Sequence, residues 1–153
     1  AITLMELKGF STEDFARFHP GGTLGKKLYL RVKDLSVHNA KPMVALMASL
    51  KEVIMEMTSK RLGATAVTGS GNSLLGIITD GDLRRMLEKS VNTADVHAQD
   101  IMTQTPATVS ENALAMEALE LLRLKDISQL VVMDGDAYAG FIHIHDLVKE
   151  GII

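Results

Sequence analysis

The sequence predicts a mixed α/β fold made of two β-α-β-β-α repeats, and three observations favour it. The octapeptide Gly76-Ile-Ile-Thr-Asp-Gly-Asp-Leu83 returns in altered form as Gly140-Phe-Ile-His-Ile-His-Asp-Leu147, at an offset of 64 residues. The same order of apolar strands, helix caps and turn residues surrounds both copies. A repeat of this length indicates supersecondary units that bury their apolar faces against each other. We therefore expect the two repeats to pack as a pseudo-twofold pair.

Composition and charge exclude several classes of protein. The chain has 153 residues, of which 46% are hydrophobic and 23% charged, as in an ordinary soluble globular protein. Its net charge of −3 gives no attraction to nucleic acid or to an anionic membrane, so we expect neither as a partner. The absence of cysteine excludes disulfides and thiolate chemistry and fits a cytoplasmic location. No apolar run approaches the roughly 18 residues of a membrane-spanning helix.

Residues 1–30 predict the helical end of a preceding domain and a linker. The first eight residues read as the last turns of a helix that Gly9 ends, so the chain is expected to be cut from a longer protein. Ser11–Asp14 offers a capping box for a second short helix. The glycine-rich segment His19–Lys27 permits either a loop around an anionic ligand, with His19 as an acid–base group, or a plain connection between domains.

The first repeat, residues 31–90, contains the start and stop signals of each expected element. A capping box at Ser49–Glu52 begins a helix, and Gly63 ends it. Gly69–Asn72 has the composition of a turn between two strands. The predicted elements are a short extended segment Met43–Ala45, a helix from Ser49, strands Ala64–Thr68 and Leu74–Thr79, and a closing helix Gly81–Lys89.

The second repeat, residues 91–153, follows a polar linker predicted over Ser90–Gln99. The tight turn Asp134-Gly-Asp136 predicts a β-hairpin. At the offset of 64, Leu50 aligns with Leu114, and Ala66-Val67 aligns with Leu130-Val131. The predicted elements are an extended segment Ala107–Val109, a helix Asn112–Lys125, strands Leu130–Met133 and Tyr138–His143, and a helix His145–Glu150.

These features resemble a tandem pair of cystathionine-β-synthase (CBS) domains. The resemblance covers residues 32–153 and rests on the doubled octapeptide, the element order and the segment Asp100-Ile-Met-Thr103 before Thr105-Pro106. A further set of motifs resembles the bacterial arabinose-5-phosphate isomerase family, in which a sugar-isomerase domain precedes a CBS pair. In chain order they are Gly9-Phe-Ser-Thr-Glu-Asp-Phe15, His19-Pro-Gly-Gly22, Leu24-Gly-Lys-Lys-Leu28, Thr79-Asp-Gly-Asp-Leu-Arg-Arg85 and His143-Ile-His-Asp-Leu147.

The isomerase resemblance implies that residues 1–30 are the C-terminal tail of a sugar-isomerase domain whose main body is missing. It also implies that His19 matches an active-site histidine of that family, which interconverts ribulose 5-phosphate and arabinose 5-phosphate for Kdo, lipopolysaccharide or capsule synthesis. A histidine suits the proton transfer between C1 and C2 that this reaction needs. Because the other residues of that domain are absent, we expect an aldose–ketose isomerase in the parent protein and no isomerase activity in this chain alone.

The CBS resemblance implies a nucleotide in the cleft between the two repeats. In CBS pairs the threonine of the repeated ending reaches a phosphate, and the aspartate three positions on accepts hydrogen bonds from ribose hydroxyls. The matching residues are Thr79 with Asp82 and His143 with Asp146. The alternative role for both pairs is helix capping, because Thr79-x-x-Asp82 is itself a capping-box pattern. Since His143 stands where threonine is usual, we expect a nucleotide first in the cleft served by Thr79 and Asp82.

Two functions are open on this basis. The first is a regulatory CBS pair that forms a homodimer within a homotetrameric parent and senses an adenine nucleotide or CMP-Kdo as a small-molecule ligand. The second is a structural oligomerisation module with no physiological ligand. No cofactor is required by either. No metal site is predicted, because His143 and His145 beside Asp146 supply two imidazoles without a third fixed ligand.

Overall fold

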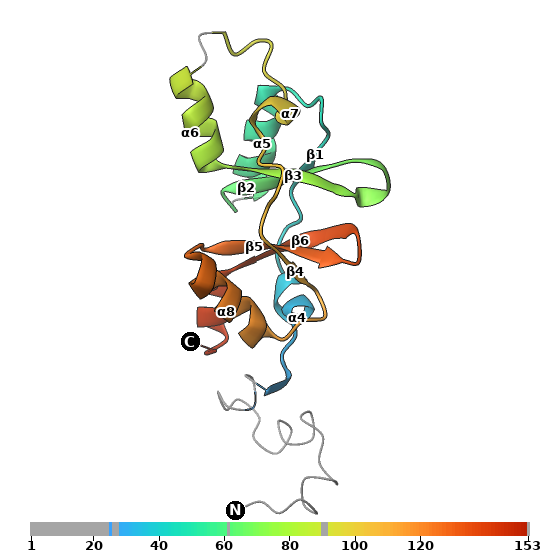
Figure 1. Cartoon of the computed structure of the whole chain (residues 1–153), viewed down its shortest axis with the longest axis vertical. Helices are drawn as coiled ribbons and strands as arrows, with labels where there is room; N and C mark the ends of the chain where they lie inside the picture. The colour runs from blue at the N-terminus through green and yellow to red at the C-terminus, as the bar shows by residue number, and fades with distance from the viewer. Residues whose placement is uncertain (1–24, 26–27, 61, 90–91, 153) are drawn as a thin grey trace, which may run out of the picture.

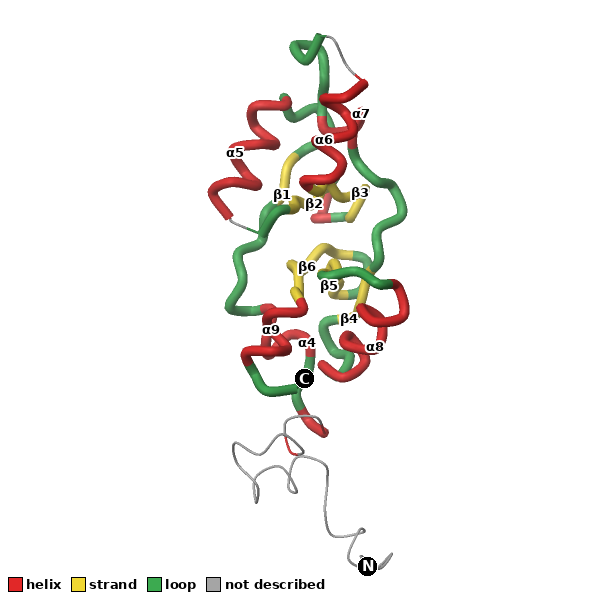
Figure 2. Tube along the Cα trace, turned by 90° about the vertical axis from the view of Figure 1, so that its left-hand side faces the viewer, coloured by secondary structure: helices red, strands yellow, loops and turns green. Residues whose placement is uncertain are grey.

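Two stacked units make up the part of the chain that the structure describes (Figure 1). The structure is a computed structural model, and it describes residue 25 and residues 28–60, 62–89 and 92–152. Each unit contains a three-stranded sheet. The two sheets face each other in the middle of the molecule, and the helices lie beyond them at either end (Figures 1 and 2). The predicted α/β class and the doubled strand-helix-strand-strand-helix order are confirmed.

The first unit joins a parallel and an antiparallel strand pair in one sheet. Its strands are β1 (Met43–Val44), β2 (Ala64–Thr68) and β3 (Leu74–Thr79), in the order β1-β2-β3. β1 runs parallel to β2, and β3 runs antiparallel to it, because a helix connects the first pair and a tight turn the second. Its helices are α5 (Leu50–Lys60) and α6 (Asp80–Lys89).

The second unit repeats this arrangement. Its sheet has the order β4-β5-β6, with β4 parallel and β6 antiparallel to the central strand. The strands are β4 (Thr108–Ser110), β5 (Gln129–Asp134) and β6 (Ala137–His143), and the helices are α8 (Ala115–Lys125) and α9 (Ile144–Lys149). Leu119 and Leu122 of α8 lie three residues apart and pack into the same core as Leu147 of α9.

Two short helices, which the sequence pattern did not predict, cross from one repeat to the other. α4 (Val32–Ser36) packs in the core of the second unit, where the Val32 N–H donates to Ala113 at 2.8 Å. α7 (Ala98–Ile101) packs in the core of the first unit, where the Ala98 N–H donates to Ala48 at 2.9 Å. The predicted linker Ser90–Gln99 is therefore wrong at its end, because its last two residues belong to α7.

The strand register corrects the sequence alignment of the two repeats by one residue. Ala66 lies opposite Ile77, and Val131 lies opposite Phe141. Ile77 and Phe141 are 64 positions apart, whereas Ala66 and Val131 are 65 apart, so Ala66 corresponds to Val131 and not to Leu130. The difference arises because the turn between the antiparallel strands is one residue shorter in the second unit.

Apolar side chains from both sheets fill the interface between the units. Small residues of β2, Ala64 and Ala66, leave room for Tyr138 and Phe141 of β6 in one buried cluster. The Tyr138 hydroxyl donates to the carbonyl oxygen of Pro42 at 2.8 Å, and its ring meets Phe141 edge-on, with centroids 5.9 Å apart. The two units therefore share a buried core and a cross-unit hydrogen bond.

The segment that leaves α7 runs closely past β3 at Gly76. Ile77 and Thr103 exchange backbone hydrogen bonds, with N···O distances of 3.0 and 2.7 Å. A Cβ at Gly76 would stand 2.7 Å from the carbonyl oxygen of Thr103, closer than real atoms approach. Gly76, the first residue of the repeated octapeptide, is thus required by this close approach, which brings Thr103 beside the end of β3.

Candidate functional site

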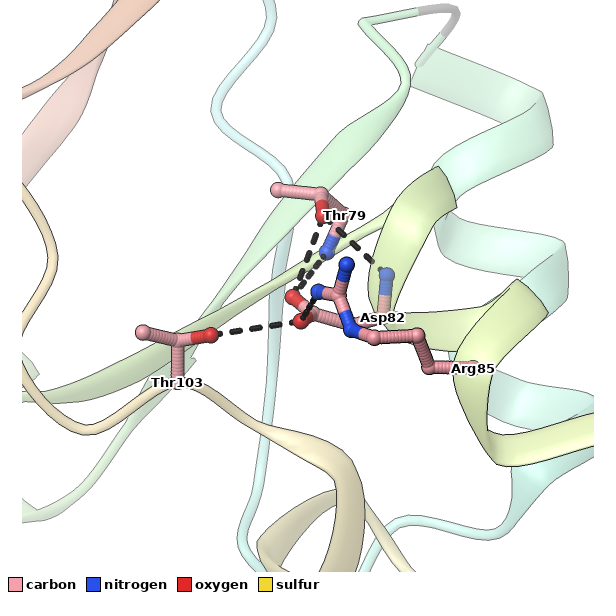
Figure 3. A network of polar contacts seen from close by, with 4 residues as sticks. All are labelled: Thr79, Asp82, Arg85 and Thr103. Atoms are coloured by element: carbon pink, nitrogen blue, oxygen red, sulfur yellow. Dashed lines mark hydrogen bonds and ion pairs between the residues drawn. The ribbon is translucent and has the colours of Figure 1, made fainter. Parts of the chain in front are cut away.

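Asp82 is the centre of a polar network that joins three segments of the first unit (Figure 3). Its Oδ2 accepts from the backbone N–H and the hydroxyl of Thr79, at 2.9 and 3.1 Å. Its Oδ1 accepts from the hydroxyl of Thr103 at 3.2 Å and forms an ion pair with Arg85, one turn further along α6. The side chain of Asp82 is only 7% exposed, whereas that of Arg85 is 62% exposed. Asp82 is thus a buried carboxylate whose two oxygens both have partners.

Thr79 completes a reciprocal capping box at the start of α6. Its hydroxyl oxygen accepts from the backbone N–H of Asp82 at 3.3 Å while its hydrogen points to the Asp82 carboxylate. The capping role considered from the sequence is therefore present. A ribose hydroxyl could reach this carboxylate only by replacing Thr103 or Arg85 at Oδ1, because Oδ2 holds the cap.

The second repeat has a matching network at the start of α9. Asp146 Oδ2 accepts from the backbone N–H of His143 at 2.8 Å and from the side-chain amide of Asn39 at 2.9 Å. Asn39 follows α4 in the chain as Thr103 follows α7, so each aspartate receives a donor from the segment after a crossing helix. His143 and Asp146 therefore lie together in a capping box, which is the alternative role considered for this pair.

His143 differs chemically from the threonine that it replaces. Its Nδ1 accepts the backbone N–H of His145 at 3.0 Å, which requires that nitrogen to be unprotonated. The two imidazole rings stack with centroids 4.5 Å apart. Burial lowers the pKa of His143, and His145 lowers it further, while Asp146 acts in the opposite direction. The neutral imidazole of His143 is therefore the form that can accept the His145 N–H at the start of α9.

A cleft of ≈ 640 Å³ opens between the two units, beside Thr79. Its apolar walls include Ile77 from the first unit and Phe141 and Ile144 from the second. Thr79 and Thr103, whose hydroxyl groups donate to Asp82, line this cleft, so the cleft adjoins the Asp82 network. This volume lies within the range of small-molecule sites in proteins.

Asp82 itself faces a second, smaller hollow. This hollow measures ≈ 320 Å³ and is lined by Asp82 with Arg85, Lys89 and Asp100. Among the predicted ligand residues in the described part of the chain, Thr79 lines the larger cleft, while Asp82, His143 and Asp146 do not. His19, and the elements predicted before residue 25, lie outside the described residues.

Several polar residues of the cleft were not predicted from the sequence, among them Asp126 and Gln129. Asp126 ends α8 in the left-handed conformation, with φ of 52°, which aspartate tolerates better than most residues. Gln129 opens β5, and its side-chain Oε1 is buried without a hydrogen-bond partner within the described residues. In the sequence, these two residues are marked only by their position just after the predicted helix Asn112–Lys125. The sequence does not place them in a cleft, because the cleft forms between segments that are far apart in the chain.

Neither a metal centre nor a membrane span is found in the ranges that the structure describes. No group of three or more histidine or acidic side chains there is arranged to hold a metal ion. In the same residues, every helix is too short or too polar to cross a bilayer.

Comparison with curated sequences identifies close relatives over the whole chain. The chain is 43% identical over 155 residues to the arabinose 5-phosphate isomerase KdsD of Pseudomonas aeruginosa, with 100% of the chain and 48% of the relative aligned. It is 41% identical over 155 residues to KdsD of Escherichia coli K12, with 100% and 47% aligned. The predicted resemblance to this family is confirmed, and the chain spans about half the length of these relatives.

Solved structures and a family model agree on the architecture. A CBS-domain containing protein from Agrobacterium tumefaciens superposes with a TM-score of 0.68 at 24% identity, covering 80% of this chain and 93% of its own. A CBS domain protein from Pyrobaculum aerophilum, complexed with AMP, superposes with a TM-score of 0.68 at 22% identity, covering 77% and 90%. The family model of the CBS domain matches residues 32–89 and again residues 98–152. The chain therefore belongs to the CBS domain family, as a tandem pair.

Proposed function

We propose that this chain is the regulatory CBS pair of an arabinose-5-phosphate isomerase and that it binds an adenine nucleotide in the cleft beside Thr79. The observation that carries the proposal is the cleft itself, ≈ 640 Å³ in volume, with apolar walls and with hydroxyl groups next to a helix N-terminus. The AMP complex of the Pyrobaculum aerophilum protein supports the ligand class. The names of the curated relatives support the enzyme that it would regulate.

The walls of the cleft suit the flat faces of a base. Ile77 and Phe141 come from facing sheets, and Ile144 begins α9. Covering an aromatic base with these side chains removes apolar area from water, which contributes about 25 cal/mol per Å². The base therefore binds between the sheets, and the sugar and phosphate extend toward Thr79.

Arg85 supplies the positive charge for a phosphate at the start of α6. Its guanidinium lies 3.4 Å, and the Thr79 hydroxyl 3.6 Å, from the point where a Cβ at Gly81 would stand. Both groups therefore flank the first turn of this ten-residue helix, whose N–H groups and dipole also attract anions. Asp82 and Arg85 line the neighbouring hollow and not the cleft itself, so for the ribose to reach Asp82 the Arg85 side chain would turn from Oδ1 to the phosphate and a ribose hydroxyl would take its place on the carboxylate.

The same site would accept other nucleotides that carry a base, a ribose and a phosphate, so CMP-Kdo is the second ligand candidate. Binding between the units would bias the attached isomerase domain by a coupling free energy of about 1–3 kcal/mol, as is usual for allosteric proteins. Exposed apolar side chains on the outer helices, Met55 at 60% and Leu87 at 58%, support a homodimer as the working unit. We propose a cytoplasmic enzyme.

A purely structural role is the competing function, and one observation favours it. The networks around Asp82 and Asp146 are satisfied by the protein's own donors, so neither carboxylate needs a ligand. In that case the pair would stabilise an oligomer without sensing a metabolite.

Isothermal titration of AMP, ATP and CMP-Kdo into this chain distinguishes the two functions. The regulatory function predicts saturable binding of at least one nucleotide, at least tenfold weaker in Asp82→Asn. Glu88→Ala, an exposed acidic residue on the same helix, is the matched control and should bind as the wild type does. If none of the three ligands gives a heat of binding, the regulatory function is wrong and the structural function is the one that remains.

A further inference from the structure

We propose that nucleotide binding in the cleft is transmitted to the isomerase domain through the second unit, by way of residues 30–39. These residues, here called the entry segment, connect the predicted domain tail to β1. This inference rests on the proposed function, and it names the part of the molecule through which the ligand would act on the enzyme.

The start of the entry segment is hydrogen-bonded to the residues around the beginning of α8. The bonds run from the Val32 N–H to the Ala113 oxygen, from the Lys33 N–H to the Glu111 oxygen, from the Ala115 N–H to the Leu30 oxygen and from the Arg31 guanidinium to the Asn112 oxygen, at 2.8, 2.9, 2.8 and 3.2 Å. The entry segment is thus fixed to the second unit mainly through its backbone, before the chain reaches the first unit.

The short helix α4 within the entry segment is packed into the second unit as well. Val32 is fully buried, and Leu35 is 6% exposed, in the core to which α8 and α9 contribute. α4 contacts β5 and β6 in addition to these two helices, and it lies among them in the lower half of Figure 1. Because closely packed interiors deform little and transmit displacement, α4 should move with the second unit as one body.

Both helices that hold the entry segment also reach the cleft. α8 meets the entry segment at its N-terminal end, and the residues after its C-terminal end, Asp126 and Ile127, line the cleft about 16 Å away. Ile144 opens α9 and lines the cleft, while Asp146 of the same helix accepts from the side-chain amide of Asn39 at 2.9 Å. A ligand that displaces either helix at the cleft would therefore displace the entry segment.

The first unit supplies the opposite wall of the cleft and meets the chain only after the entry segment. Its first strand, β1, begins at Met43, and its wall of the cleft includes Ile77 and Thr79 of β3. A nucleotide that contacts both walls would change the position of one unit relative to the other. The entry segment, and the domain before it, would follow the second unit.

Distances between spin labels, measured by double electron–electron resonance, test this attachment. The chain has no cysteine, so introduced cysteines can carry labels at Val37 just after α4, at Met55 on α5 and at Leu124 on α8. These side chains are 63%, 60% and 82% exposed, so the labels leave the cores intact. We expect saturating AMP to shift the Val37–Met55 distance by more than about 1 Å, the scale of helix shifts in allosteric proteins, and to leave the Val37–Leu124 distance unchanged.

Two controls make the outcomes decisive. Dilution with unlabelled chain confines each distance to one molecule, and calorimetry of each labelled chain shows that AMP is bound. A change in the Val37–Leu124 distance at saturation overturns the proposal, because the entry segment would then move on the second unit. An unchanged Val37–Met55 distance overturns it too, and in both cases nucleotide binding still stands. If neither the labelled chains nor the wild type bind AMP, the proposed function fails and this inference fails with it.

A flexible glycine insert between Tyr29 and Leu30 tests the transmission in the full-length isomerase. The insert leaves the anchored segment and the cleft in place, so the affinity for AMP should stay as in the wild type while the effect of AMP on the isomerase rate is lost. The same insert after Gly135, in a turn where an added Cβ meets nothing within 4 Å, is the matched control and should keep that effect. An effect of AMP that survives the insert after Tyr29 overturns the proposal. If AMP does not change the rate of the wild-type enzyme, the proposed regulation fails, and this inference with it.

Discussion

Asp82 is the residue at which helix capping and the proposed ligand binding would use the same carboxylate. Oδ2 holds the first turn of α6, and Oδ1 is shared by Thr103 and the mostly exposed Arg85. Because Arg85 is 62% exposed, water and salt screen its ion pair, so this bond is the easier one to exchange. Oδ2 is therefore committed to the cap, and Oδ1 is the oxygen that the proposed ligand would take.

The capping role of Asp82 predicts that removing its side chain destabilises the unliganded protein. Asp82→Ala should lower the free energy of unfolding by about 1–2 kcal/mol, the usual loss when a capping side chain is removed. Urea denaturation measures the change. The exposed Glu88→Ala on the same helix should shift it by less than about 0.5 kcal/mol. Equal stability of Asp82→Ala and the wild type would contradict a structural role for the network.

His143 predicts a pH dependence of stability with a definite sign. Burial and His145 lower its pKa below the ordinary value of 6.5, so the unfolded chain binds this proton more readily than the folded one. Stability is therefore full above the unfolded pKa and falls as the pH drops from 6.5 toward the folded pKa. Protonation also removes Nδ1 as the acceptor for the His145 N–H.

Melting curves between about pH 7.5 and about pH 5 test this slope, in the range where histidines titrate. His143→Thr, which copies the cap of the first repeat, should reduce the loss of stability at low pH. His38→Gln, at an exposed histidine, should leave the slope unchanged. The same slope in wild type and His143→Thr would show that other groups cause it.

At the scale of elements, the close passage of the α7–β4 segment over β3 depends on Gly76. Gly76→Ala should destabilise the fold by about 1–3 kcal/mol, because its Cβ would stand 2.7 Å from the carbonyl oxygen of Thr103. Gly81→Ala, inside α6, meets nothing closer than 3.4 Å and should be neutral or stabilising by up to about 1 kcal/mol. Urea denaturation of both variants measures the contrast, and equal effects would contradict the close approach.

The sequence predicted those elements whose signals are local. The capping box at Ser49 and the turn at Asp134-Gly-Asp136 mark boundaries that the structure reproduces closely, in α5 and in the β5–β6 hairpin. The helices α4 and α7 were missed because they are short and because their apolar residues are buried by the opposite repeat. A pattern within one repeat contains no information on such a partner.

The same reasoning explains which parts of the site were predicted. Thr79 with Asp82 and His143 with Asp146 lie three residues apart at helix starts, so spacing alone brings each pair together. Thr103 and Gln129 join the site from distant segments through the crossing of the chain and the stacking of the sheets. The presence of these two residues at the site depends on tertiary packing, and the spacing of residues along the chain contains no information on that packing.

At the scale of the whole molecule, the two units are held together by the exchanged helices and by the buried interface around Tyr138. Burial raises the pKa of Tyr138, with a further contribution from Glu56, so its hydroxyl stays protonated and donates to Pro42. The Pro42 carbonyl also accepts from Ala66 at 3.1 Å and keeps that partner if the hydroxyl is lost.

Tyr138→Phe should therefore lower the free energy of unfolding by about 1 kcal/mol, the net value of one hydrogen bond. Urea denaturation checks it, and Tyr29→Phe, at a tyrosine with 38% exposure, is the control expected to change little. A stability unchanged by Tyr138→Phe would mean that the cross-unit bond contributes nothing.

The most direct test of nucleotide binding between the units is a titration of AMP into the methyl-labelled chain, followed by nuclear magnetic resonance. Ile127 and Ile144 line the cleft, whereas Ile54 lies on the outer helix α5 with 42% exposure. We predict saturable shifts of the two cleft methyl signals and none at Ile54. Unchanged cleft signals at saturating AMP, or shifts confined to residues outside the cleft, would contradict binding there.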